Sequence, residues 1–577
     1  MLGAGIEEYL MTMGVLVSFV GSILFAAASR KEILNAFKGS RLRAEHLIFA
    51  AAILLVFISV EGIFIKPTQL LFFDDVIYQN MAVNILHMGQ AWMCNYGNAF
   101  TCFSGQVFHE PVGTAFLLAL GFLAFGANLG TTYGTFFLLS AIAVIFTFFA
   151  ALLLFKKVGA ALFSELLVAV APVLLVWAKP TSSDLPSLAF SSIAVFALLV
   201  FIKEKNVRTF SFAGFAVVLL AYMKVFNAIY VLLIPLLYII LDDKNLRASI
   251  SKNLKRAYEG MLNLKLLAVL LVLVLVISPE IGYSYQQLVS GTYGNGSAVM
   301  IQNTCNTSKY MPSNSSISLK DFGLNSCANV LFWFNAYRSD YVMQPAIFTL
   351  LAVAGAAMLF FRNKRALLAI GLWFLVIFVI ITAFYAGGVT YGVDWRFMLG
   401  LIEQSSLLGG FGAYSLFEFG RGIGGKRRTE LFGIISAVLL LVLIFYPVYS
   451  LLPQLSINPS NIPQAQPARF YEGFVYNYSY LIPRSCIVLS YDPTLFNIAG
   501  LASAQMDYLY SPTAMGSFRS NYSCLVLDYG YWCHTPANIC PALGQGFVPI
   551  KSVTDTEGNY TYGFYYINAT QNQIKVG

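Results

Sequence analysis

The sequence predicts an all-α polytopic membrane protein with a small α/β or mostly-β domain at its C-terminal end. Of the 577 residues, 58% are apolar and only 11% are charged, and the mean hydropathy is +0.71. Soluble domains carry about 25% charged residues, so this composition is typical of a chain that crosses a membrane many times. After residue 449 the pattern changes to short strand-like runs between polar turns, which predicts the C-terminal domain.

Twelve apolar segments are predicted to span the membrane, because the longer ones approach the ~20 residues that cross roughly 30 Å of hydrocarbon. They are 9–28, 46–64, 131–155, 160–178, 186–202, 210–223, 225–241, 264–281, 341–361, 366–385, 398–419 and 430–449. The apolar segment 112–127 is interpreted as a surface or re-entrant helix. The run 210–241 is divided at Lys224, because one continuous helix would overshoot the bilayer and leave this charge in mid-membrane.

The basic residues predict which ends of the spans face the cytoplasm. Of the 35 Lys and Arg residues, 23 lie in six connecting loops. These loops are 30–43, 156–157, 203–208, 242–265, 362–365 and 420–428. By the positive-inside rule they are cytoplasmic, so both termini and the intervening outer loops are extracytoplasmic. Because topology accounts for the formal net charge of +8, we expect no nucleic-acid partner.

Cysteines and glycosylation sequons support the same orientation. All eight cysteines lie in predicted outer segments in even numbers, as disulfides in an oxidising compartment require. They are Cys94 and Cys102, Cys305 and Cys327, and Cys486, Cys524, Cys533 and Cys540. Seven N-x-S/T sequons fall in the same regions, at Asn295, Asn306, Asn314, Asn477, Asn521, Asn559 and Asn568. We therefore expect a glycoprotein of the cell membrane or the endoplasmic reticulum.

The chain divides into three regions. Residues 1–45 are expected to form an extra N-terminal helix and a basic cytoplasmic loop. The main transmembrane domain occupies residues 46–449 and is interrupted by outer loops at 65–130 and 282–340. Residues 450–577 comprise a proline-punctuated linker and an extracytoplasmic domain that its cysteines are expected to staple.

The acidic pair Asp74-Asp75 stands at the outer mouth of a span and opens the run DDVIYQNMAVNILHMG. Carboxylates near lipid are costly, so two in succession need a reason. One reading is a helix N-cap at the positive end of the helix dipole. The other, equally supported by these residues alone, is a general base that accepts a proton from an incoming hydroxyl. The run itself predicts an amphipathic helix lying along the membrane surface.

Other polar residues map to the same predicted membrane face. His109 and Glu110 precede a helix start, Asp184 follows Lys179 by five residues beside a span, and Arg396 lies in the segment YGVDWRFMLG just before another span. Each has a structural alternative, namely an ordinary helix start, an N-cap, or an arginine that snorkels to the headgroups. The functional reading is a phosphate site, for which the guanidinium fork and the ammonium group are suited.

Together these residues fit glycosyl transfer from a polyprenyl-phosphate sugar. A carboxylate would deprotonate the acceptor hydroxyl, and cations would stabilise the departing phosphate in a cleft of low dielectric. A second set of acids inside or at the ends of spans could be functional or could serve helix packing: Glu61, Glu165, Glu280 and Glu403.

Four segments resemble motifs of the GT-C glycosyltransferases, in particular the branch of protein O-mannosyltransferases and lipid A aminoarabinose transferases. They are FFDDVIYQNMAVNILHMGQ, HEPVGTAFLLALGFLAFG, SSDLPSLAF and DWRFML. The resemblance implies a transfer from a lipid-linked sugar outside the cytoplasm, with Asp74 as the catalytic base and Asp75 beside it. Within that scheme Lys179, Arg396, His109 and Glu110 bind the donor phosphate, and Asp184 is a supporting acid.

The sequence departs from the family pattern in three places. The acidic pair is Asp-Asp where the family usually has Asp-Glu, Glu110 replaces the first proline of the His-Pro-Pro motif, and an extra helix precedes the usual first span. The expected partners are a polyprenyl-phosphate-linked sugar, membrane lipid, and a protein, lipid or glycan acceptor. A divalent metal is compatible with the sequence but no motif demands it.

Three other readings stay open at this stage. The tail run DYGYW, Asp528 to Trp532, resembles part of the WWDYG motif of oligosaccharyltransferases, although Val526 and Leu527 stand where the tryptophans should be. A polytopic transporter would be expected to keep its charges at the bilayer midplane, often in repeated halves, and no repeat is visible here. The third is a non-catalytic membrane scaffold.

Overall fold

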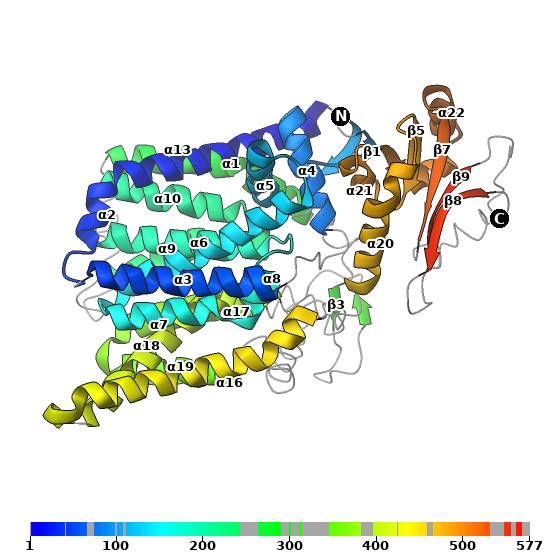
Figure 1. Ribbon diagram of the computed structural model, residues 1–577. Helices are drawn as coiled ribbons and strands as arrows, with labels where there is room; N and C mark the ends of the chain where they lie inside the picture. Colours follow the sequence, from blue (N-terminus) through cyan, green and yellow to red (C-terminus); the bar gives the residue numbers. More distant parts are fainter. Residues whose placement is uncertain are drawn as a thin grey trace.

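The computed structural model describes residues 2–40, 42–65, 74–98, 101–107, 111–242, 264–289, 299–301, 311–313, 345–381, 396–423, 425–457, 465–530, 547–554 and 561–567. Long apolar helices lie side by side in one bundle, and a β-sheet caps one end of it (Figure 1). The predicted fold class, a helical membrane protein with a small C-terminal sheet domain, is confirmed.

Helices occupy all the predicted spans. The bundle consists of α1 (Leu2–Ala28), α3 (Ala44–Phe64), α6 (Leu129–Phe155), α7 (Val158–Ala169), α8 (Pro172–Trp177), α9 (Asp184–Glu204), α10 (Val207–Ala221), α11 (Tyr230–Asp242), α13 (Leu264–Val289), α16 (Ala346–Arg362), α17 (Lys364–Ile380), α18 (Leu399–Ile423) and α19 (Gly425–Ile457). In the described part of the chain, 6 helices are long and apolar enough to cross a membrane by themselves. The number of twelve spans therefore stays a prediction.

Two predicted spans are divided in ways that matter for the site. The span 160–178 is broken before Pro172, which has no N–H to donate and so begins a new helix, α8. The division of 210–241 is confirmed, because α10 ends at Ala221 and a short 3₁₀ helix, η1 (Val225–Ile229), precedes α11. Lys224 lies in extended backbone between them.

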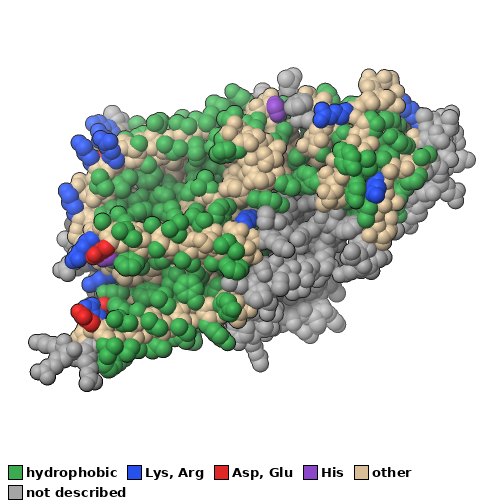
Figure 2. Space-filling model, in the orientation of Figure 1, with side chains coloured by type: hydrophobic (Ala, Val, Ile, Leu, Met, Phe, Trp, Pro, Cys, Tyr) green, Lys and Arg blue, Asp and Glu red, His purple; other side chains and the backbone are tan. Residues whose placement is uncertain are grey.

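The two ends of the bundle differ in charge. Lys and Arg side chains gather at the end remote from the sheet, around α2 (Arg30–Ala36) and the tips of neighbouring helices, while the sides are apolar (Figure 2). At this end Lys203 Nζ donates a hydrogen bond to the carbonyl oxygen of Ala36, at 2.7 Å, and Lys205 Nζ lies 2.6 Å from Asp242 Oδ1. The expected orientation, with the sheet on the outer side, stays a prediction.

Glycines allow close packing of neighbouring helices, as two examples show. A Cβ on Gly412 of α18 would lie 2.1 Å from the carbonyl oxygen of Leu351 in α16, and one on Gly113 would lie 2.4 Å from that of Tyr222. Small residues let helix backbones approach, and this gains van der Waals contact where lipid offers no hydrophobic driving force. Gly113 thereby fixes the start of α5 (Gly113–Phe125) against the end of α10.

The predicted outer loop 65–130 is well structured where it is described. It contains α4 (Asp74–Met88), β1 (Trp92–Gly97), β2 (Cys102–Val107) and α5. The expected disulfide between Cys94 and Cys102 is present and closes the β1–β2 hairpin. Helix α5 is buried over most of its length and packs against α4 and α6.

The C-terminal region folds as a mixed sheet with helices. Its elements are α20 (Ala465–Tyr478), β5 (Cys486–Ser490), α21 (Pro493–Ile498), β6 (Ala502–Gln505), α22 (Pro512–Asn521), β7 (Cys524–Tyr529), β8 (Phe547–Thr554) and β9 (Thr561–Ile567). Strand β5 runs parallel to β6 and β7, and β9 runs antiparallel to β7 and β8. The predicted stapling is confirmed for Cys486–Cys524, while Cys305, Cys327, Cys533 and Cys540 lie outside the described residues.

The sheet also contains the hairpin of the outer loop. Its strand order is β2-β1-β6-β5-β7-β9-β8, and β1 pairs with β6 through Tyr96 with Ala504 and Gly97 with Ser503. Two strands of the transmembrane region thus complete the sheet of the C-terminal domain, which the sequence did not predict. A second short hairpin, β3 (Val299–Ile301) with β4 (Met311–Ser313), lies in the predicted loop 282–340.

Candidate functional site

A buried carboxylate between two cations lies at the sheet end of the bundle. Lys224 Nζ is 2.6 Å from Asp184 Oδ1, and Arg396 Nε is 3.3 Å from Asp184 Oδ2. The side chains of Asp184, Lys224 and Arg396 are 3%, 1% and 16% exposed. Sequence analysis had proposed Asp184 and Arg396 for one site, and the structure brings them together.

Local structure explains why these three side chains meet. Asp184 is the first residue of α9, where the helix dipole favours a carboxylate. Lys224 stands in the gap between α10 and η1, and Arg396 precedes α18, so each cation comes from a helix end. The ring of Phe397 contacts both, with its centroid 4.7 Å from Lys224 Nζ and 5.2 Å from Arg396 Cζ.

Two cations converge on one carboxylate in this cluster, and all three side chains are largely shielded from solvent. Charges interact more strongly in a low dielectric than in water, so two converging cations favour an anion beside them. Lys224 was missed by sequence analysis as a site residue. The available signal was a lone charge in a long apolar run, which marks a functional or paired position in a membrane protein.

Lys179, a predicted phosphate-binding residue, contacts the end of α3. Its Nζ donates hydrogen bonds to the carbonyl oxygens of Glu61 and Ile65, both at 2.6 Å, and lies 3.4 Å from Glu61 Oε2. The contact ties the last turn of α3 to the connection between α8 and α9. Lys179 and Asp184 therefore have separate counter-ions, although both belong to the same short connection.

The acidic pair lies at the start of α4. Asp74 begins the helix, but its side chain is outside the described part of the structure, whereas Asp75 is fully buried. Val76 packs into the hydrophobic core of the C-terminal domain. The start of α4 is therefore held against the sheet.

Hydrogen bonds fix the rest of α4 to the hairpin. Asn80 Oδ1 accepts a hydrogen bond from the backbone N–H of Cys94, at 2.9 Å, and Asn84 Nδ2 donates one to the carbonyl oxygen of Trp92, at 2.7 Å. The apolar residues Ile77 and Met81 are also buried. The expectation of an amphipathic helix lying on the membrane surface is wrong in this respect, because the polar side of α4 is covered by β1.

Three predicted residues fall outside the described residues. His109 and Glu110 lie just before Pro111, and Asp394 lies two positions before Arg396. The structure therefore places only the elements that follow them, α5 and α18.

The buried acids of the second set have individual surroundings. Glu403 Oε2 accepts a hydrogen bond from Ser191 Oγ, at 3.3 Å, between α18 and α9. Nearby, Trp373 Nε1 donates to Tyr230 Oη, at 2.9 Å. Glu165 and Glu280 are also buried, in α7 and α13. These positions lie in the helix bundle and suit helix packing as well as function.

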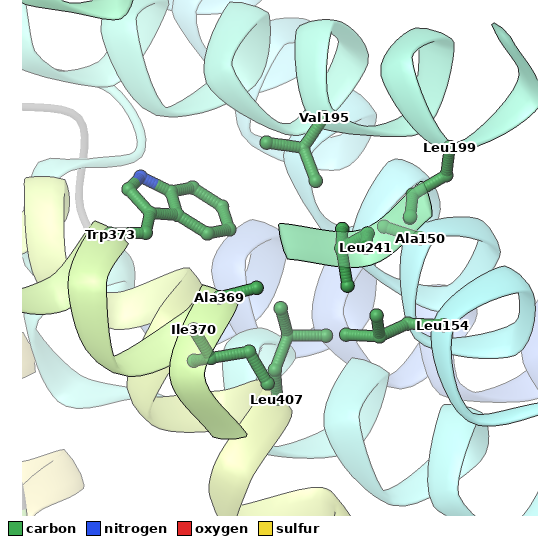
Figure 3. Close-up of a pocket in the computed structure, with 9 residues that line it drawn as sticks. All are labelled: Ala150, Leu154, Val195, Leu199, Leu241, Ala369, Ile370, Trp373 and Leu407. Carbon is green, nitrogen blue, oxygen red and sulfur yellow. The ribbon is translucent and has the colours of Figure 1, made fainter. Parts of the chain in front are cut away.

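A small cavity adjoins Trp373 inside the bundle. Its volume is about 20 Å³, and the side chains around it are aliphatic apart from Trp373 (Figure 3). They come from α6, α9, α11, α17 and α18. A space of this size is comparable to what a single water requires, so it does not hold a sugar.

A larger apolar groove opens between α3, α7, α8 and α19. Its volume is about 390 Å³, and Val60, Leu175, Val442 and Phe445 contribute to its walls. Val60 directly precedes Glu61, and Leu175 lies four residues before Lys179. The groove therefore runs close to the Lys179–Glu61 pair, at the same end of the bundle as the cluster at Asp184.

Among the residues that the structure describes, no group of three or more His, Cys, Asp or Glu side chains is arranged to hold a metal ion. His109, Glu110 and the side chain of Asp74 are not among them, so the expectation of a divalent metal stays a prediction.

Comparison with known proteins agrees with this architecture. The family described as "Dolichyl-phosphate-mannose-protein mannosyltransferase" matches residues 109–281, a stretch that contains Lys179, Asp184 and Lys224. Two solved structures have a similar fold. ArnT from Cupriavidus metallidurans, bound to undecaprenyl phosphate, has a TM-score of 0.54 at 11% identity over 92% of this chain and 99% of that chain.

The second is the oligosaccharyltransferase of Archaeoglobus fulgidus in its apo form, with a TM-score of 0.51 at 13% identity over 91% of this chain and 75% of that chain. The chain has the GT-C fold. The fold expected from the resemblance to the GT-C membrane glycosyltransferases is therefore confirmed. No curated protein matches the sequence.

Proposed function

We propose that this GT-C protein transfers a sugar from a polyprenyl-phosphate donor to an acceptor hydroxyl on the extracytoplasmic side. The observation that carries the proposal is the buried cluster in which Lys224 and Arg396 both contact Asp184. A polyprenyl-phosphate sugar is a phosphodiester with one negative charge, which two converging cations attract.

The same charges favour the chemical step over substrate binding alone. The acceptor oxygen attacks the anomeric carbon, the bond from that carbon to the phosphate oxygen breaks, and the lipid phosphate leaves with a second negative charge. The cations therefore interact more strongly with the transition state than with the bound donor, which is the requirement for catalysis.

Asp74 is proposed as the base that takes the proton from the acceptor hydroxyl. The acidic motif supports this role, as does the position of α4, which starts beside the sheet at the same end of the bundle as the cluster (Figure 1). Asp75 is its neighbour in the pair. His109 and Glu110 keep their proposed place at the donor phosphate, because they directly precede α5, which packs on α4.

The apolar groove is proposed to hold the lipid tail of the donor. Its walls are aliphatic and aromatic, and one wall residue, Val60, is the sequence neighbour of Glu61, which pairs with Lys179. A polyprenyl chain needs such a surface, because it is apolar along its length. The similar ArnT structure contains undecaprenyl phosphate, which supports a donor of this class.

No observation favours the alternatives more strongly. In the DYGYW run Asp528 is fully buried, and its Oδ2 accepts hydrogen bonds from Tyr471 Oη and Ser490 Oγ, both at 2.6 Å. A carboxylate used in this way holds the domain together and does not reach an acceptor peptide. A transporter would keep its charges at the bilayer midplane, whereas the charged cluster lies at the end of the bundle.

The test is sugar transfer by the full-length protein in lipid nanodiscs. Polyprenyl-phosphate mannose, glucose and aminoarabinose with a radiolabelled sugar would be supplied with peptide, lipid and glycan acceptors. Arg396→Gln should reduce transfer by about 100-fold, the usual effect of losing one preorganised charge partner. The control Arg208→Gln removes a guanidinium at the basic end, 3.8 Å from Glu32, and should leave transfer unchanged. Equal rates for both variants would contradict the proposal.

A further inference from the structure

The connection between α8 and α9 has an unusual content of buried hydroxyl groups. Thr181 and Ser182 are 0% and 1% exposed, and within the described residues neither Thr181 Oγ1 nor Ser182 Oγ has a hydrogen-bond partner. Further along α9, Ser187 Oγ donates to the carbonyl oxygen of Ser183, at 2.6 Å, and Ser192 Oγ to that of Leu188, at 3.0 Å. On this side of α9 the hydroxyls of Ser187 and Ser192 are thus satisfied, whereas the two of the connection are not.

This arrangement is unfavourable for folding alone. A hydroxyl that is removed from water without a new hydrogen bond destabilises the folded state. Two successive residues with this property indicate that a bound molecule is their partner.

The charges on either side identify the kind of molecule. Lys179 stands two residues before Thr181, and Asp184, with Lys224 and Arg396, follows Ser182 by two residues. Hydroxyl donors between two cationic centres match a ligand with several acceptor oxygens and a negative charge. A phosphate group fulfils both conditions, and hydrogen bonds to an ionised acceptor are the stronger kind.

We propose that Thr181 and Ser182 donate hydrogen bonds to the phosphate of a lipid-linked ligand. Residues 179–184, named here the phosphate strap, form this binding site together with Lys224 and Arg396. The identity of the ligand as a sugar donor rests on the proposed function, but the phosphate binding itself does not require transfer. The strap explains why the hydroxyls are buried and unpaired, since they are satisfied when the phosphate is bound.

The test compares phosphate binding by variants of the full-length protein in nanodiscs. Thr181→Val and Ser182→Ala remove only the hydroxyl groups and nearly preserve the side-chain volume. Thr147→Val and Ser140→Ala are matched controls, because these buried α6 hydroxyls donate to the carbonyl oxygens of Ala143, at 2.8 Å, and Phe137, at 2.7 Å. The probe is radiolabelled undecaprenyl phosphate, and thermal unfolding verifies that each variant is folded.

Each strap variant should weaken binding of undecaprenyl phosphate by about tenfold, and the controls should stay within about twofold of the unmodified chain. Inorganic phosphate and phosphatidic acid, used as competitors, show which source of the phosphate the strap accepts. If one of these competitors displaces the probe from the unmodified chain but not from the strap variants, the anion site is supported. The site is then assigned to free phosphate or to a membrane headgroup, according to which competitor acts.

Two results would contradict the proposal that the phosphate strap binds a phosphate group. One is binding of undecaprenyl phosphate with equal affinity by the strap variants and the unmodified chain. The other is no binding of any of the three probes by the folded unmodified chain. Failure of the proposed function gives a different result, in which no sugar is transferred by the unmodified chain but phosphate binding still weakens in Thr181→Val.

Discussion

Lys224 reaches Asp184 across forty positions of sequence, with Nζ 2.6 Å from Oδ1 and both side chains almost fully buried. The contact joins the gap between α10 and η1 to the first turn of α9. The connection that carries the phosphate strap is therefore anchored by a buried ion pair.

We expect Asp184→Asn to destabilise the fold by about 3–5 kcal/mol, because it takes from the buried cations Lys224 and Arg396 the carboxylate that both contact. The double variant Asp184→Asn with Lys224→Met should recover part of this stability, since one of the two buried cations is removed too. Neither variant should transfer sugar. Thermal and denaturant unfolding with a transfer assay check this, and an unchanged melting temperature in Asp184→Asn would show that the contact does not contribute to stability.

Asp74→Asn is expected to abolish sugar transfer without loss of folding, because the amide cannot accept the acceptor proton. Losing a general base typically costs 10²–10⁴-fold in rate, so we expect a loss of about this size. Asp242→Asn is the control, since this carboxylate pairs with Lys205 at the opposite, basic end. If Asp75→Asn abolishes transfer and Asp74→Asn does not, the roles within the pair are reversed.

Stability of the C-terminal domain should depend on pH in the acid range. Burial raises the pKa of Asp528 to about 7, and burial also raises the pKa of Asp492 to about 6. Both values lie above the ordinary value of 3.8, so between these limits the folded domain binds more protons than the unfolded chain. Stability is then highest below about pH 4 for these groups and falls as the pH rises to about 7.

The loss should amount to a few kcal/mol, because one unit of pKa corresponds to about 1.4 kcal/mol. The measurement is the unfolding of the full-length protein between pH 4 and 8, followed by the fluorescence of the domain. Asp528→Asn should flatten the curve, since the neutral amide mimics the protonated acid and can still accept from Tyr471 Oη. An equally steep curve in this variant would assign the dependence to other groups.

A bulky side chain in the apolar groove should raise the KM of donors with a long lipid and leave that of donors with a short lipid unchanged. Val442 lines the groove from α19 and is 56% exposed, so Val442→Trp narrows the groove without disturbing the core. We expect KM to rise several-fold for an undecaprenyl donor and to stay unchanged for a short-chain analogue. Val438→Trp, on an exposed α19 position that does not line the groove, is the control. Equal KM values for the long donor in both variants would exclude the groove as the tail site.

The hairpin disulfide should matter for transfer. Cys94 and Cys102 close the hairpin whose N–H at Cys94 binds Asn80 of α4. Replacing both cysteines by serine should reduce transfer several-fold, because α4 and its acidic pair lose a rigid support. Limited proteolysis would show whether the hairpin becomes accessible to protease. Full activity of the folded variant would mean that the position of α4 does not depend on the disulfide.

Local patterns in the sequence were sufficient for the general architecture. Apolar length and the charge of the connecting loops predicted the helices, and the division near Lys224 was anticipated because an unbroken helix would be too long. The even number of cysteines in each outer segment predicted disulfides, and Cys94 and Cys102, the two cysteines of their segment, form one. These features depend on neighbouring residues or on simple physical lengths.

Features that depend on contacts between distant segments were not predicted. Lys179 and Asp184 were expected to face one phosphate together, and the contact of Lys179 with Glu61 could not be foreseen because α3 is distant in the sequence. Lys224 was identified only as a helix boundary, since its pairing with Asp184 depends on how α9 and α10 pack. The helix α4 was assigned to the membrane surface because the strand that covers its polar side, β1, could not be seen in the sequence pattern.

The pairing of Tyr96 with Ala504 has a consequence for biogenesis. During synthesis the hairpin leaves the ribosome long before β6 is made. The edge of β1 that pairs with β6 therefore has no strand partner until most of the polypeptide has been synthesised. An exposed strand edge invites mispairing with other chains. A chain that stops prematurely, before residue 502, would therefore be expected to fail at its first extracytoplasmic loop as well as at its tail, and to be recognised by cellular quality control although every span is present.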